Sequence, residues 1–120
     1  MARNSEARLI GMIGEAIAER YLIDGNLAIV DRNWRCDDGE IDLIARDPMG
    51  EIVIVEVKTR SSGRFGVGSE AITAEKYRRL HQLARRWCKA RGITVDYRVD
   101  VISIDGLTLP KVTHLKRVIL

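Results

Sequence analysis

The sequence contains few of the residues that build disulfide-stabilised or zinc-stabilised folds. Among its 120 residues there are two cysteines, two histidines and two prolines, and aromatic residues make up only 5%. Cys36 and Cys88 form no CxxC pair, which excludes the usual zinc-binding patterns, so both are expected to be packed thiols. No apolar run approaches the roughly 20 residues of a membrane span, and the first residues, MARNSEAR, contain no signal-peptide core. These absences predict a cytoplasmic protein that does not cross a membrane.

The composition that remains is typical of a folded chain. Hydrophobic residues make up 46% and charged residues 31%, and the length predicts one domain over residues 1–120. The formal net charge is +3 and the isoelectric point is about 9.1. This excess of positive charge fits an anionic partner such as nucleic acid, although a solvated basic surface explains it equally well.

Apolar spacing predicts helices and strands in the order αβββαβ. The first helix is expected to begin at Asn4 or Ser5 and to end near 24–25, and Thr73 is expected to cap a second helix that runs to Arg91. Strands are expected over 27–35, twice within 39–60, and over 94–104, while residues 107–120 are either a strand or a short helix. The first three strands form an antiparallel meander, and the fourth lies parallel to the third after a helical crossover. The fold class is therefore α/β, a mixed sheet flanked by helices.

Acidic residues interrupt the two apolar strands within 39–60. Side chains alternate along a strand, so Glu56 and Lys58 project from the same face. Pro48 and Gly50 favour a three-residue loop with a glycine bulge, which pairs Asp47 with Glu51. A two-residue loop over 48–49 would instead send Asp42 and Glu56 to opposite faces. The bulge register predicts two facing pairs, Asp42 with Glu56 and Glu40 with Lys58, and an apolar opposite face of Ile41, Leu43, Ala45, Val53, Val55 and Val57.

Carboxylates on an apolar strand are costly unless a cation or another partner compensates them. Asp42 and Glu56 offer hard oxygen ligands for Mg²⁺ or Mn²⁺, and the backbone carbonyl of Val57 between them is a further ligand. A metal there can activate water for phosphodiester hydrolysis, and Lys58 can orient that water or neutralise the transition state. The alternative is a structural salt-bridge cluster, in which Glu40, Asp42 and Glu56 would share one lysine, a poor charge balance.

Arginines follow the hairpin and match phosphate geometry. Arg60 and Arg64 lie at and after the strand end, in and beside a glycine-rich loop over 61–69, and Arg78 and Arg85 lie on the second helix; all four are expected to bind nucleic acid. Residues 66–71, GVGSEA, match the dinucleotide-binding pattern GxGxxA. That pattern begins six residues after the strand, however, and a Rossmann domain needs more parallel strands than this chain holds.

Asp42, the triplet Glu56-Val57-Lys58 and the αβββαβ order resemble the PD-(D/E)XK nuclease superfamily, which has the restriction-endonuclease-like fold. GEIDLIA, EVKTR and the GExxA at 14–18 are similar to the bacterial YraN-like family over nearly the whole chain. An acid on the first helix, as at Glu15, is similar to archaeal Holliday-junction resolvases, whereas helical periodicity alone favours a solvated helix residue at Glu15. The chain departs from the motif at Ile41, where the motif has proline.

This resemblance implies a restriction-endonuclease-like fold and a nuclease that needs Mg²⁺ or Mn²⁺. It assigns Asp42, Glu56 and Glu15 as catalytic metal ligands and Lys58 as the catalytic lysine. The substrate would be nucleic acid, with DNA favoured, in branched or structured form. A resolvase would also need a two-fold homodimer to cut symmetrically. A module that keeps the fold and binds nucleic acid without cleaving it stays open as the alternative.

Overall fold

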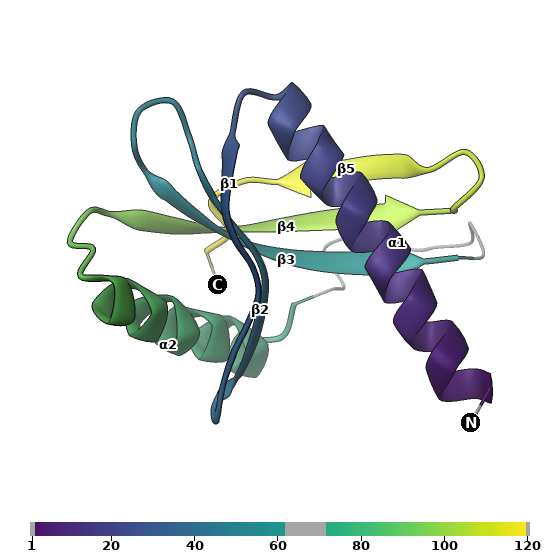
Figure 1. The fold of residues 1–120 in the computed structure, drawn as a ribbon, viewed down its shortest axis with the longest axis horizontal. Helices are drawn as coiled ribbons and strands as arrows, with labels where there is room; N and C mark the ends of the chain where they lie inside the picture. The colour runs from purple at the N-terminus through teal and green to yellow at the C-terminus, as the bar shows by residue number, and fades with distance from the viewer. Residues whose placement is uncertain (1, 62–71, 120) are drawn as a thin grey trace.

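The computed structural model describes residues 2–61 and 72–119, which form one mixed sheet with a helix on each face (Figure 1). The strands follow the order β1-β2-β3-β4-β5, in which β3 and β4 are parallel and the other neighbours are antiparallel. The elements are α1 (Ala2–Asp24), β1 (Ala28–Cys36), β2 (Gly39–Arg46), β3 (Ile52–Arg60), α2 (Ala74–Arg91), β4 (Tyr97–Asp105) and β5 (Lys111–Leu115). The predicted αβββαβ mixed sheet is confirmed, and β5 resolves the open assignment of residues 107–120.

Three of the four helix termini have the capping interactions or the glycine that the local sequence favours. The Thr73 hydroxyl accepts a hydrogen bond from the Lys76 amide at 3.1 Å, which caps α2 as predicted. Gly92 closes the helix with φ 64°, a left-handed conformation that glycine adopts without strain. The Gly25 amide donates to the carbonyls of Tyr21 and Leu22 at the end of α1. The predicted cap at residues 4–5 is wrong, because α1 already begins at Ala2.

The turn between β2 and β3 has the predicted three-residue loop. The Gly50 amide donates to the Asp47 carbonyl at 2.9 Å, and Gly50 has φ 92°, as a glycine bulge requires. The Asp47 amide donates to the Glu51 carbonyl at 3.0 Å. The resulting register pairs Leu43 with Val55 and Ala45 with Val53, which confirms the predicted strand alignment.

Beyond Leu43 the structure departs from the predicted hairpin. The paired residues of β2 and β3 end at Leu43 and Val55, and β2 then runs away from β3 together with β1 (Figure 1). Glu40 therefore does not face Lys58 and lies instead 3.4 Å from Arg35, on β1. The predicted face of Ile41 is also wrong, because this residue packs in the α2-side core and not beside Leu43.

A left-handed residue on β1 lies beside this change. Asn33 has φ 46° and lies between the pairs Arg32–Leu43 and Trp34–Ile41. The register of β1 and β2 does not shift here, but the positive φ interrupts the extended backbone of β1. Asparagine tolerates this conformation better than most residues do. This residue lies beside Asp42, where the pairing of β2 with β3 has ended.

Two apolar clusters hold the helices on the sheet. The buried residues of the cluster on the α1 side are Ala18, Leu22, Leu43, Ala45, Val53, Val55, Ile102 and Ile104. The buried residues of the cluster on the α2 side are Ile41, Ile44, Ile52, Ile54, Leu80, Leu83, Ala84, Trp87, Cys88 and Val99. Cys88 is a packed free thiol, as predicted, and the free Cys36 thiol is partly buried and packs against the same α2-side cluster. Neither described helix is long and apolar enough to cross a membrane.

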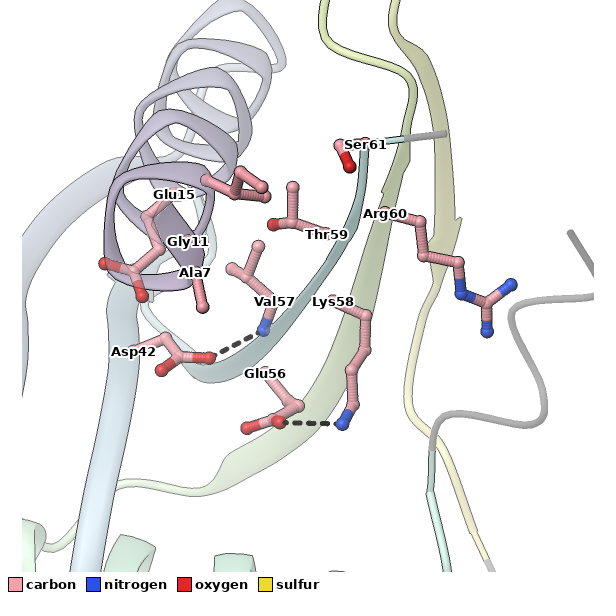
Figure 2. Close-up of a pocket in the computed structure, with 11 residues that line it drawn as sticks. Ala7, Gly11, Glu15, Asp42, Glu56, Val57, Lys58, Thr59, Arg60 and Ser61 are labelled. Carbon is pink, nitrogen blue, oxygen red and sulfur yellow. Dashed lines mark hydrogen bonds and ion pairs between the residues drawn. The ribbon is translucent and has the colours of Figure 1, made fainter. Parts of the chain in front are cut away.

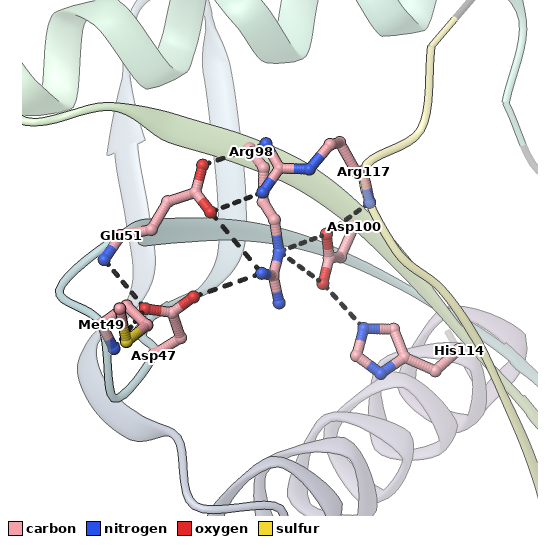
Figure 3. A network of polar contacts seen from close by, with 7 residues as sticks. All are labelled: Asp47, Met49, Glu51, Arg98, Asp100, His114 and Arg117. Atoms are coloured by element: carbon pink, nitrogen blue, oxygen red, sulfur yellow. Dashed lines mark hydrogen bonds and ion pairs between the residues drawn. The ribbon is translucent and has the colours of Figure 1, made fainter.

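A polar network ties the hairpin loop to β4 and the C-terminal segment (Figure 3). The fully buried Asp100 carboxylate lies 3.1 Å from Arg98 Nε and 2.7 Å from His114 Nε2, and it accepts the Arg117 amide at 2.9 Å. Arg98 also reaches Asp47 in the hairpin loop at 3.3 Å. The charge of Asp100 is therefore compensated within the protein, and the network anchors the hairpin-loop end of β3, where the strand begins.

Gly14 permits the close approach of α1 to β3. A Cβ at this position would lie 1.8 Å from Thr59 Oγ1 and 2.8 Å from Thr59 Cβ. We expect Gly14→Ala to lower the free energy of unfolding by about 1–3 kcal/mol, because the helix must shift. Gly11→Ala, one turn earlier, meets nothing within 4 Å and should be neutral or stabilising by up to about 1 kcal/mol. Urea unfolding of both variants tests this contact, and equal effects would contradict it.

Candidate active site

The candidate site forms where β2 and β3 separate. The Asp42 carboxylate accepts a hydrogen bond from the Val57 amide at 2.8 Å, where the β2 backbone no longer pairs with β3 (Figure 2). This bond fixes the acid of β2 beside the end of β3. The amide and carbonyl of one strand residue point to the same edge, so the Val57 carbonyl is directed into the same gap.

A cavity of about 520 Å³ opens onto this gap between α1 and the end of β3. Glu56 and Lys58 reach it from one side of β3, with 3.8 Å between Lys58 Nζ and Glu56 Oε2, as strand alternation predicts. The cavity is lined by Ala7, Ile10, Gly11, Glu15, Asp42, Glu56, Val57, Lys58, Thr59, Arg60 and Ser61 (Figure 2). The structure therefore brings together Glu15, Asp42, Glu56, Val57, Lys58 and Arg60 from the predicted site residues.

Asp42 carries charge that the protein does not fully compensate. Burial, followed by repulsion from Glu56, raises the pKa of the Asp42 carboxyl to about 7, although the hydrogen bond from the Val57 amide opposes the rise. Glu56 itself is only 7% exposed. Asp100 shows the contrast: burial also opposes its ionisation, but His114 and other donors hold the pKa of that carboxyl below its ordinary value. An added cation in the gap beside Asp42 would offset the burial of this carboxylate and its repulsion from Glu56.

Lys76 is a site residue that sequence patterns did not reveal. It reaches from the first turn of α2 to Glu56, with 2.5 Å between Lys76 Nζ and Glu56 Oε2. Burial and the neighbouring positive charge of Lys76 lower the pKa of Lys58. Burial also opposes the charge of Lys76, but its contacts with Glu56 and Lys58 and its attraction to Asp42 together raise the pKa of Lys76. A signal existed in the sequence. A lysine three residues after the cap opposes the helix dipole, at a position where glutamate or glutamine is favoured.

Glu15 lies at the edge of the cavity and not in a closed ligand cluster. Its carboxylate accepts a hydrogen bond from Asn33 Nδ2 at 2.9 Å, and it extends from α1 on the side of Asp42 (Figure 2). Within residues 2–61 and 72–119, only Cys36, Asp37 and Asp38 bring three ligand atoms within 4.8 Å of one another. Those two aspartates are exposed and already bind Arg86 at 2.6 Å.

The predicted nucleic-acid-binding arginines lie in different places. Arg60 lines the cavity, but its side chain extends away from Asp42 and Glu56 in Figure 2. Arg78 and Arg85 are on α2 outside this cavity, and their spacing of seven residues places them on one side of the helix. Arg64 and the GVGSEA pattern at 66–71 lie outside the described residues.

Comparison with known proteins gives a family match over most residues of this cavity. The family described as Uncharacterised protein family UPF0102 matches residues 14–104. The UPF0102 protein of Paenarthrobacter aurescens is 43% identical over 113 residues, which cover 92% of this chain and 93% of the relative. That of Beutenbergia cavernae is 50% identical over 113 residues, covering 91% and 94% respectively. The matched segment contains Glu15, Asp42 and 56–58.

One solved structure also aligns with the chain. It is that of SfsA from Pyrococcus furiosus in complex with Ca²⁺, and the two chains share 16% sequence identity with a TM-score of 0.39. The alignment covers 92% of this chain and 63% of the SfsA chain.

Proposed function

The chain belongs to the uncharacterised protein family UPF0102, the YraN-like family that its sequence resembles, and we propose that it is a metal-dependent nuclease. Its substrate is nucleic acid, with branched or structured DNA favoured. The observation that carries this proposal is the convergence of Asp42 and Glu56, from two strands, on one cavity that also holds Lys58. The fold alone would not support it, because the same fold can host a binding module.

The residues present fit a divalent cation. The Asp42 and Glu56 carboxylates and the Val57 carbonyl are the hard oxygen donors that Mg²⁺ and Mn²⁺ prefer. The raised pKa of Asp42 reflects burial and, after it, repulsion from Glu56, and a cation would offset both. Glu15 stands at the edge of the same cavity as a further carboxylate. When bound, such a cation lowers the pKa of a water molecule and stabilises charge on a phosphodiester.

The side chains around this donor set have separable tasks. Lys58 lies 3.8 Å from Glu56, so its ammonium group can orient the attacking water or neutralise the charge that builds up on the phosphate. Arg60 lines the outer part of the cavity, where it can bind a neighbouring phosphate. Arg78 and Arg85 extend the basic surface along α2, and they would position the nucleic acid without reading its sequence.

A cleavage panel tests the proposal. Wild-type protein is incubated with branched, single-stranded and duplex DNA and RNA in Mg²⁺, Mn²⁺ or Ca²⁺. We expect cleavage with Mg²⁺ or Mn²⁺, and binding with little cleavage in Ca²⁺, which is larger and activates water less well. Asp42→Ala and Glu56→Ala should each abolish cleavage, while Asp24→Ala, at an exposed acid at the far end of α1, should not. Equal cleavage by Asp42→Ala and wild type, or no cleavage on any substrate, favours a non-catalytic binding module.

The arginines of α2 give a second prediction. Arg78→Ala and Arg85→Ala should each reduce the salt dependence of nucleic-acid binding by roughly one phosphate contact, because each removes one site of counterion release. Arg86→Ala is the matched control on the same helix, since Asp37 and Asp38 already neutralise that arginine. Binding constants over a series of salt concentrations give the slopes. Unchanged slopes in both test variants would place the nucleic-acid surface elsewhere.

A homodimer and a cytoplasmic location stay predictions.

A further inference from the structure

Glu56 already has a cationic partner in the metal-free protein, and this partner comes from outside its own strand. Lys76 Nζ lies 2.5 Å from Glu56 Oε2, whereas Lys58 Nζ lies 3.8 Å from the same oxygen. The Glu56 side chain is almost completely buried and Lys76 is half-buried, so solvent screens this ion pair only in part. The acid that would bind the cation is thus neutralised from the α2 side.

Local structure does not explain a lysine at this position. The Lys76 amide donates to the Thr73 hydroxyl, which places Lys76 in the first turn of α2. The positive end of the helix dipole disfavours a cation there, and glutamate or glutamine is the residue that completes a helix cap at this point. The contact with Glu56 is the interaction that compensates for the unfavourable position.

The ion pair and a bound metal would compete for the same carboxylate oxygen. An ammonium group and a divalent cation repel each other, and this repulsion is strong where water is largely excluded. Within the described part of the chain, the Asp42 carboxylate forms no ion pair with a lysine and instead accepts the hydrogen bond from the Val57 amide. The two acids of the site therefore differ, because a lysine side chain of α2 forms an ion pair with Glu56 but not with Asp42.

We propose that Lys76 is a built-in counterion that occupies Glu56 and is displaced when a divalent cation binds between Asp42 and Glu56. The location of the cation rests on the proposed function. A hollow of about 220 Å³, lined by Glu40, Lys76 and Arg79 among others, adjoins Glu56 on the α2 side and can receive the released ammonium group. Lys76 is thus a positioning residue. It stabilises the acidic site without metal and sets the metal concentration at which the site fills.

The test measures Mn²⁺ affinity by calorimetry on chelator-treated protein at about pH 8. We expect Lys76→Met to bind Mn²⁺ about tenfold more tightly than the wild type, a size typical of coupled binding events. Lys76→Arg should restore the competing cation and stay close to the wild type. Lys89→Met is the matched control, because it removes the same charge from an exposed position on the same helix. Lys76→Gln provides a second neutral variant if Lys76→Met proves too unstable to measure.

The outcomes separate this inference from the proposed function. Asp42→Ala should abolish tight Mn²⁺ binding in both the wild-type and Lys76→Met proteins. If it does so, but Lys76→Met binds Mn²⁺ no more tightly than the wild type, Lys76 only packs against Glu56 and the inference is wrong. If Lys89→Met raises the affinity as much as Lys76→Met, the effect is one of overall charge, and the inference is wrong again. If Asp42→Ala leaves Mn²⁺ binding unchanged, or no variant binds Mn²⁺, the metal centre itself is contradicted.

Discussion

Lys58→Ala is expected to slow phosphodiester hydrolysis at least about a hundredfold and to leave Mn²⁺ binding no weaker than in the wild type. Loss of one electrostatic contact made in the transition state has an effect of this size. Lys58 donates no ligand atom, and its positive charge lies 3.8 Å from Glu56, so its removal cannot weaken the attraction for a cation. Binding of Mn²⁺ should therefore be preserved while the rate of hydrolysis falls.

Single-turnover rates at saturating Mn²⁺, together with Mn²⁺ and nucleic-acid affinities, test this expectation. Lys89→Ala serves as the control for a lysine lost from the surface of α2. A rate within about tenfold of the wild type would mean that Lys58 does not contact the reacting phosphate or water. A loss of Mn²⁺ affinity would mean that Lys58 instead holds Glu56 in place.

Asp42→Asn is expected to stabilise the metal-free protein at neutral and alkaline pH. The pKa of the Asp42 carboxyl is raised to about 7, and a carboxyl whose pKa is higher in the folded state favours folding when it is protonated. Its contribution is therefore fully present below about pH 4 and is lost as the pH rises through about 7. Asparagine cannot ionise, yet it keeps an oxygen for the Val57 amide.

The rise in the pKa of Asp42 from its ordinary 3.8 to about 7 corresponds to at most roughly 4 kcal/mol, and solvent at the mouth of the cavity reduces this value. Urea unfolding in the presence of a chelator should show nearly equal stability for the two proteins at about pH 4, and a growing advantage for Asp42→Asn up to about pH 8. Saturating Mn²⁺ should then stabilise the wild type more than the variant. If the free energies of unfolding of the two proteins change in parallel with pH in the absence of metal, Asp42 does not carry an uncompensated charge.

The hairpin could be predicted because its register depends on local chemistry. Pro48 and Gly50 select the loop, and the loop fixes which residues of β2 and β3 face each other. Strand alternation then places Glu56 beside Lys58. These steps need only the preferences of single residues and the two-residue repeat, so local sequence was sufficient for this part of the site.

The parts that could not be predicted depend on distant segments. β2 leaves β3 beside Asn33 of β1, which has a positive φ. Beyond this point Ile41 packs on the α2 side, and Glu40 lies near Arg35 and not opposite Lys58. Lys76 meets Glu56 only because the crossover from β3 brings the start of α2 back to the sheet. Local sequence patterns do not predict such a contact between separate elements. Asparagine in a strand and lysine in the first turn of a helix were the visible signals. Each is an unfavourable local choice, and such choices concentrate at functional sites.

The most direct test of the metal centre is anomalous X-ray diffraction from crystals of the protein soaked in Mn²⁺. We expect one strong anomalous peak between the carboxylates of Asp42 and Glu56, with Lys76 turned away from Glu56, and no peak there in Asp42→Asn crystals soaked in the same way. The metal centre is contradicted if the wild-type gap holds no Mn²⁺ while another acidic group, such as Asp37 and Asp38, binds it.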